Sequence, residues 1–196
     1  MNIRIYAQGT DEIMQNAERI VVNTAYEPLK KYKRWNKPCI LDNGAFQGKT
    51  ATPEQLVKIA EKINPELIIA PDVRFDSKAS LRLTLDYAAE INDKWLNKSI
   101  AVFRPEPNEF QEHLDKIYDA GFKWLAFPSG ENINYFKGRF RALIDEKGFK
   151  LHVLGAQDGT WTLLTQLKYH SIDFVSQDIN EFKHIVEKIK EWSIIL

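Results

Sequence analysis

Residues 38–72 read PCILDNGAFQGKTATPEQLVKIAEKINPELIIAPD, and this stretch contains the pattern that decides the fold. Two short, nearly continuous apolar runs, Cys39–Asp42 and Leu67–Ala70, are typical of parallel strands that are buried on both faces. Between them, residues 52–55 supply an N-cap hydroxyl, a proline at the first helical position and a glutamine in the reciprocal capping position. The stretch therefore predicts a strand, a helix and a second strand.

The same alternation of apolar runs and amphipathic helix patterns recurs along the whole chain, and eight cycles can be counted. The candidate strands are Ile3–Ala7, Arg19–Asn23, Cys39–Asp42, Leu67–Ala70, Ile100–Phe103, Trp124–Phe127, Leu151–Leu154 and Ile172–Ser176. With 196 residues, the chain suits a single domain, residues 1–196, and we expect a minimal (β/α)₈ TIM barrel. An open, doubly wound sheet is the alternative fold.

Acidic residues follow several of the candidate strands. Asp42 and Asp72 come at the ends of two strands, and Asp173 and Asp178 bracket the end of the last one. Both candidate folds bind ligands at the carboxyl ends of their strands. We therefore expect the functional site at this end, whichever fold the chain adopts.

Composition limits the classes of protein that the chain can belong to. Lysine plus arginine and aspartate plus glutamate number 27 each, so no global basic field indicates nucleic-acid binding. Local mixtures of cations and aromatic residues remain at 30–37 and 137–141. Cys39 is the only cysteine, which excludes an internal disulfide and a multi-cysteine zinc site. Without a signal peptide or a membrane-spanning run, we expect a soluble cytoplasmic protein that has no membrane partner.

Several of these strand ends resemble one family, the queuine and archaeosine tRNA-guanine transglycosylases and their DNA-modifying relatives. Residues 41–47 (Leu-Asp-Asn-Gly-Ala-Phe-Gln) are similar to the family's Asp-Ser-Gly-Gly-Phe-Gln motif, and Asp72 falls where the family has a base-recognising aspartate. Residues 127–131 resemble the end of its glycine-rich loop, and residues 152–155 resemble a segment that packs on the base. The motifs occur in the family's order from about residue 38 to 180.

The resemblance implies a base exchange through a covalent aspartyl-glycosyl intermediate, with one carboxylate as nucleophile and a second that transfers protons. Asp42 is the expected acid/base. The nucleophile falls at Ser176 in a strict alignment and at Asp178 in an alignment on the DNA-modifying relatives, and we favour Asp178. The residues expected to bind the substrate are Asn43, Phe46, Asp72, Arg104, Ser129, Gly130, Glu131, Leu154 and Gly155.

Each assignment also has a structural alternative. Asp42-Asn43-Gly44 is a common turn sequence, and Asp72 or Asp178 would suit the N-cap of a helix. Phe46 and Leu154 are residue types that are ordinarily found in a hydrophobic core. His152 is expected to be a packed or hydrogen-bonded histidine rather than a ligand.

The chain lacks the family's cysteine-rich zinc subdomain and its RNA-binding modules, which favours DNA over tRNA as the partner. The predicted function is replacement of guanine by a 7-deazaguanine in nucleic acid, without a metal or other cofactor. A homodimer or an accessory protein would fit the reduced size. The alternatives are a nucleosidase or glycosidase that uses the same carboxylates, or a catalytically silent protein that binds 7-deazaguanines or nucleic acid.

Overall fold

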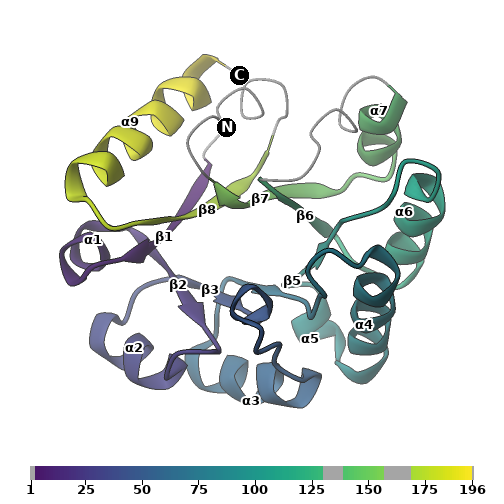
Figure 1. Cartoon of the computed structure of the whole chain (residues 1–196), viewed down its shortest axis with the longest axis horizontal. Helices are drawn as coiled ribbons and strands as arrows, with labels where there is room; N and C mark the ends of the chain where they lie inside the picture. The colour runs from purple at the N-terminus through teal and green to yellow at the C-terminus, as the bar shows by residue number, and fades with distance from the viewer. Residues whose placement is uncertain (1–2, 130–138, 157–168, 196) are drawn as a thin grey trace.

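Eight short parallel strands alternate with helices along the chain and close into a barrel (Figure 1). The structure, a computed structural model, describes residues 3–129, 139–156 and 169–195. Its strands are β1 Arg4–Gly9, β2 Arg19–Asn23, β3 Cys39–Asp42, β4 Leu67–Ile69, β5 Ser99–Val102, β6 Trp124–Pro128, β7 Lys150–Ala156 and β8 Ser171–Ser176. Pairing of β1 with β8, from Arg4 with Ser171 to Gly9 with Ser176, closes the barrel. The predicted (β/α)₈ fold is therefore confirmed, and the open sheet is excluded.

Helices surround the barrel as an outer ring (Figure 1). They are α1 Asp11–Asn16, α2 Pro28–Trp35, α3 Pro53–Ile63, α4 Ser77–Glu90, α5 Asp93–Leu96, α6 Phe110–Asp119, α7 Arg139–Glu146 and α9 Ile179–Ile195, with a short 3₁₀ turn, η1, at Ala45–Gln47. The capping box predicted for α3 is present, because Thr52 Oγ1 accepts a hydrogen bond from Gln55 N–H (3.2 Å) and Gln55 Oε1 accepts one from Thr52 N–H (2.9 Å). No helix within the described ranges is long and apolar enough to cross a membrane.

Alternate residues of each strand face the barrel interior and the surrounding helices. The interior is filled by one apolar cluster, formed by Tyr6, Val21, Ile40, Leu67, Ile69, Ile100, Val102, Trp124 and Ala126. The outward residues, among them Val22, Leu41 and Phe174, join a larger cluster with the helices. Each fully buried aliphatic or aromatic side chain of this kind contributes about 1.5–3 kcal/mol to stability. Because both strand faces are buried, the strands read as continuous apolar runs in the sequence.

The amino ends of the strands are closed by paired polar groups. Tyr6 Oη donates a hydrogen bond to Glu66 (2.8 Å), and Arg19 Nε donates to the same carboxylate (3.0 Å). These two hydrogen bonds stabilise the negative charge of Glu66 at the amino end of the barrel. In barrels of this kind the amino end contributes to stability, and the active site lies at the carboxyl end of the strands.

Candidate active site

The loop after β3 holds Asp42 in a fixed turn. Gly44 N–H donates a hydrogen bond to Asp42 Oδ1 (2.7 Å), and Ala45 N–H donates to Asn43 Oδ1 (2.7 Å). Gly44 has φ +79°, and a Cβ atom there would lie 2.7 Å from the carbonyl oxygen of Lys49. A larger residue would therefore both strain the backbone and clash with it. The Asp-Asn-Gly sequence forms a real turn, and this turn orients the carboxylate of Asp42.

Three carboxylates from different strands lie close enough to interact at the carboxyl end of the barrel. The pKa of Asp42 is raised to about 6, first by burial and then by the negative charges of Asp173 and Asp72; hydrogen bonds from Gly44 N–H and the Asn23 side chain act in the opposite direction. Asp72, which follows β4, and Asp173, in β8, are both buried. A carboxyl group that titrates near neutral pH is suited to proton transfer.

Replacement of Asp42 by Asn should stabilise the protein in a pH-dependent way. A carboxyl whose folded-state pKa lies above its unfolded value of 3.8 favours folding while it is protonated, and this contribution is lost as the pH rises through about 6. Asp42→Asn should therefore raise the free energy of unfolding by about 2–3 kcal/mol above pH 7, and by much less near pH 4. Urea unfolding of both proteins across this range measures the difference; a constant difference would contradict the pKa assignment.

Asp72 lies in a buried polar cluster that also contains Asn43 and Arg104. The Asn43 side-chain amide donates hydrogen bonds to Asp72 Oδ1 (2.8 Å) and to the Ala70 carbonyl oxygen (2.6 Å). Arg104 Nε donates to Asp72 Oδ2 (3.2 Å), and both charged side chains are almost completely buried. Three of the residues expected to bind the substrate are thus brought together. A base that binds Asp72 would share the carboxylate with these donors, which its four lone-pair positions allow.

Asp173 is the acid to which the sequence assigned no role. It accepts a hydrogen bond from Gly155 N–H, and its Oδ2 lies 3.7 Å from Nε2 of the fully buried His152. His152 Nδ1 lies 2.8 Å from Ser171 Oγ, as expected for a hydrogen-bonded histidine. His152 Nε2 has no hydrogen-bond partner among the described residues. Asp173 is therefore held by a backbone donor, with an imidazole nitrogen beside it.

Asp178 occupies a different environment from these three acids. Its side chain is exposed, and Oδ1 accepts hydrogen bonds from the N–H groups of Asn180 (2.6 Å) and Glu181 (3.0 Å), so it caps α9. Ser176, the other alignment candidate, is buried and bonds to Glu181 and to the Asp178 carbonyl oxygen. The structure thus matches the helix-cap alternative for Asp178 and does not bring this residue into the acidic group. Successive side chains of β8 point to opposite faces of the sheet, and Phe174 points outward toward the helices. This alternation indicates that Asp173 points into the barrel.

Phe46 lies at the rim of the barrel and not in its core. It is 66% exposed, and Phe75, in the loop after β4, is 78% exposed. The guanidinium of Arg74 lies 4.4 Å from the Phe46 ring centroid and 4.5 Å from that of Phe75. Phe75 also has φ +63°, a backbone conformation that is unusual for a bulky residue. Two exposed rings with a cation over both therefore form an aromatic rim, and Phe46 belongs to the loop that follows Asp42.

The remaining predicted residues are at the ends of β6 and β7. Ser129 N–H donates to the Leu154 carbonyl oxygen (2.9 Å), and the Ser129 hydroxyl donates to that of Gly155. Leu154 packs against the interior cluster, as its core alternative predicted. Gly130 and Glu131 lie outside the described residues. Hydrogen bonds thus join Ser129 to Leu154 and Gly155, and Gly155 N–H also donates a hydrogen bond to Asp173.

The described residues contain no group of three histidine, cysteine or acidic side chains that could hold a metal ion. The three carboxylates therefore act on one another through their charges and do not form a metal-binding cluster. The arrangement offers a group of three carboxylates, of which Asp42 has a raised pKa, flanked by amide and guanidinium donors.

Comparison with solved structures identifies the fold. The chain matches the BexX/CysO complex of Amycolatopsis orientalis (TM-score 0.64, 13% identity, 99% of this chain and 89% of that chain). It has the TIM-barrel fold. It also matches orotidine 5′-monophosphate decarboxylase of Methanocaldococcus jannaschii with the inhibitor BMP (TM-score 0.55, 19% identity, 100% and 99% coverage). A third match is a truncated 3-deoxy-D-arabino-heptulosonate 7-phosphate synthase of Thermotoga maritima (TM-score 0.54, 11% identity, 98% and 86% coverage).

At such low identity these likenesses establish the fold alone. None of these three structures is a tRNA-guanine transglycosylase. No family profile matches the sequence, and no curated protein matches it. Function must therefore be argued from the side chains at the carboxyl end of the barrel.

Proposed function

We propose that the protein is a transglycosylase that replaces guanine in nucleic acid by a 7-deazaguanine. The observation that carries this proposal is the convergence of Asp42, Asp72 and Asp173 at the mouth of the barrel, with the pKa of Asp42 raised to about 6. Base exchange needs one carboxylate that stays ionised and one that gives and takes a proton. Unequal environments for neighbouring acids are the usual way to separate these roles.

In the proposed reaction Asp173 is the nucleophile, in place of Asp178. An Asp173 oxygen attacks C1′ of the target nucleotide, the C1′–N9 bond breaks, and guanine leaves with the bonding electrons and a proton from Asp42. The incoming base then loses its N9 proton to Asp42, and its nitrogen attacks C1′ and displaces Asp173. Asp42 is protonated again at the end, so the cycle balances. A pKa near 6 supports both proton transfers at neutral pH.

The polar cluster at Asp72 supports recognition of a guanine-like base. Guanines and 7-deazaguanines present an N1–H and an exocyclic amine side by side, and an ionised carboxylate accepts from both. Arg104 and Asn43 orient that carboxylate through the hydrogen bonds described above. These contacts favour a base with adjacent donors over one with adjacent acceptors.

The aromatic rim supports a polymer as the substrate. Exposed rings stack on bases with about 1–3 kcal/mol each, and a nearby arginine adds attraction to phosphate. Phe46, in the loop after β3, and Phe75, in the loop after β4, are exposed, and the Arg74 guanidinium lies near both rings. We propose DNA as the polymer and include tRNA in the test.

The test is incubation of the protein with DNA or tRNA and isotopically labelled 7-cyano-7-deazaguanine, followed by nucleoside analysis. We expect label in the polymer and one equivalent of released guanine per label incorporated. Released guanine with abasic sites and no label would instead establish a hydrolase on the same carboxylates. Binding of the base without any release from either polymer would show a catalytically silent protein. The Asp42→Asn, Asp173→Asn double variant is the control for background exchange.

A further inference from the structure

A cavity of about 550 Å³ lies on the outer wall of the barrel between α2, α3 and the loop after β3. None of the acids at the barrel mouth lines it. This volume falls within the range of small-molecule sites. We name it the α2–α3 pocket; its walls include Thr24, Leu29, Lys49, Lys58, Ile59 and Lys62.

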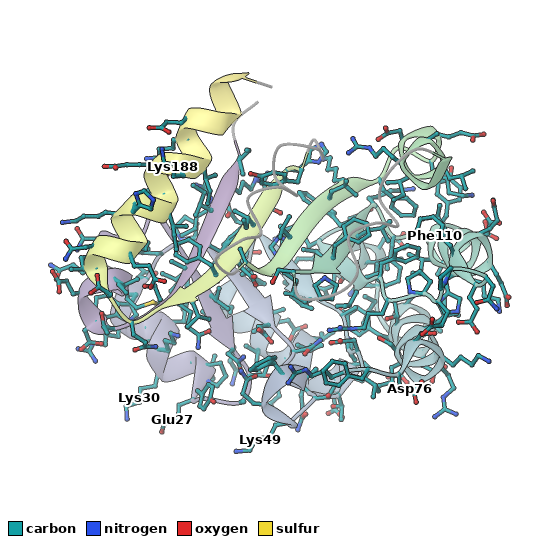
Figure 2. The ribbon with its side chains drawn as sticks, turned by 45° about the horizontal axis from the view of Figure 1, so that its top comes forward. Glu27, Lys30, Lys49, Asp76, Phe110 and Lys188 are labelled. Carbon is teal, nitrogen blue, oxygen red and sulfur yellow. The ribbon has the colours of Figure 1, made fainter. Side chains whose placement is uncertain are left out.

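The walls of the α2–α3 pocket combine cations with apolar groups. Among the described residues, no carboxylate lines it and none forms an ion pair with the three lysines. Lys58 and Lys62 are one turn apart on α3, where like charges repel by about 0.2–0.5 kcal/mol. Lys49 extends outward on the same side of the molecule as Glu27 and Lys30, which pair with each other at 3.1 Å (Figure 2). The pocket therefore carries positive charge that the described part of the chain leaves unneutralised.

Thr24 lies in a wall of the pocket, but its Oγ1 is buried without accessible surface and has no hydrogen-bond partner among the described residues. A Cβ atom on Gly44 would lie 2.8 Å from this oxygen, so the hydroxyl packs beside the turn at Gly44 and does not reach the cavity.

We propose that the α2–α3 pocket binds a phosphate-bearing nucleotide, either free or as part of a nucleic-acid strand. Lysine ammonium groups are point charges that bind phosphate well, and three of them match a dianionic group better than a single carboxylate. Leu29 and Ile59 provide apolar surface for the rest of the nucleotide.

The pocket is also connected to the loop that carries Asp42. Lys49 in its wall belongs to the same loop, and a Cβ atom on Gly44 would lie 2.8 Å from Thr24 Oγ1. A ligand that contacts Lys49 therefore touches the loop that holds the turn at Gly44. The binding itself does not depend on the chemistry proposed for the mouth.

Isothermal titration calorimetry at low ionic strength tests the site with guanosine 5′-monophosphate, guanosine, and an oligonucleotide with or without a 5′-phosphate. We expect the nucleotide to bind at least about tenfold more tightly than guanosine, and Lys58→Gln, Lys62→Gln to lose at least about tenfold in affinity. The control, Arg82→Gln, Lys183→Gln, removes two positive charges from exposed positions on α4 and α9. It should retain affinity within about twofold.

Two further variants separate this site from the mouth and from a purely structural role. Asp173→Asn should retain the lysine-dependent part of nucleotide binding, so failure of base exchange leaves this result intact. Thr24→Val should leave nucleotide binding close to that of the wild type and the protein at least as stable, because it removes a buried, unpaired polar atom that does not reach the cavity.

Comparison of the titrations with free nucleotide and with oligonucleotides also identifies the source of the phosphate. Lysine-dependent binding of the free nucleotide indicates a separate small ligand, whereas lysine-dependent binding of oligonucleotides alone assigns the pocket to the polymer. Equal affinity for guanosine and its monophosphate, equal affinity of the lysine variant and the wild type, or no binding of any probe at millimolar concentration would each overturn the proposal.

Discussion

Asp173→Asn should reduce base exchange by more than about a thousandfold while the barrel remains folded. Asparagine keeps the shape of the side chain and an oxygen that can accept the hydrogen bond from Gly155 N–H. It lacks the ionised oxygen that attacks C1′, so the covalent intermediate cannot form. Trapping of the protein on DNA or tRNA, followed by denaturing electrophoresis, should show an adduct for the wild type and none for the variant.

Asp178→Asn is the matched control, because it makes the same chemical change in the acid that caps α9. Asparagine is also a good N-cap, so stability and adduct yield should both stay close to those of the wild type. The opposite pattern, with adduct lost in Asp178→Asn and retained in Asp173→Asn, would return the nucleophile to the residue favoured by the sequence motif.

A second measurement on Asp173→Asn does not depend on any activity. The negative charge of Asp173 raises the pKa of Asp42, so its removal should lower that pKa. Carbonyl NMR titration of Asp42 in both proteins measures the shift. An unchanged pKa would mean that the two carboxylates are too far apart to share one reaction.

The barrel could be predicted from the sequence because its strands are buried on both faces. β2 and β3 have the predicted bounds, and the other strands differ by one or two residues at an end. The differences are largest in β1, which begins one residue later and ends two residues later than predicted, and in β7, which begins one residue earlier and runs on to Ala156 beyond an irregularity in its pairing with β8. Such irregularities depend on contacts between strands, and local apolar patterns do not report them.

The site was harder to predict, because a site residue must lie at the end of a strand and its side chain must also point into the barrel. Asp42, Asp72, Asn43 and Arg104 were found from the strand ends, and the structure brings them together. Asp173 was visible as an acid, but the motif comparison favoured Asp178. The alternation of inward and outward residues in β8 would have placed Asp173 inside. The α2–α3 pocket arises where two helices meet a loop, and no sequence period marks it.

Arg104→Met should lower the free energy of unfolding by about 3–5 kcal/mol at pH 7. Arg104 Nε bonds to Asp72, and the side chain of Asp72 is only 3% exposed. Methionine fills part of the space but leaves a buried carboxylate with its charge uncompensated by the guanidinium. Urea unfolding followed by circular dichroism measures the loss. A loss below about 1 kcal/mol would place the pair with exposed ion pairs, which contribute little.

The double variant Asp72→Asn, Arg104→Met separates the effect of the charge from the effect of packing. Asparagine at position 72 keeps an oxygen that can accept from the Asn43 amide, and it carries no charge that needs a partner. The double variant should therefore recover more than half of the stability that Arg104→Met loses, because no unpaired buried charge remains. Equal losses in the two proteins would mean that Arg104 stabilises the barrel through packing. Its link to Asp72 would then orient the base-binding carboxylate without contributing to the stability of the fold.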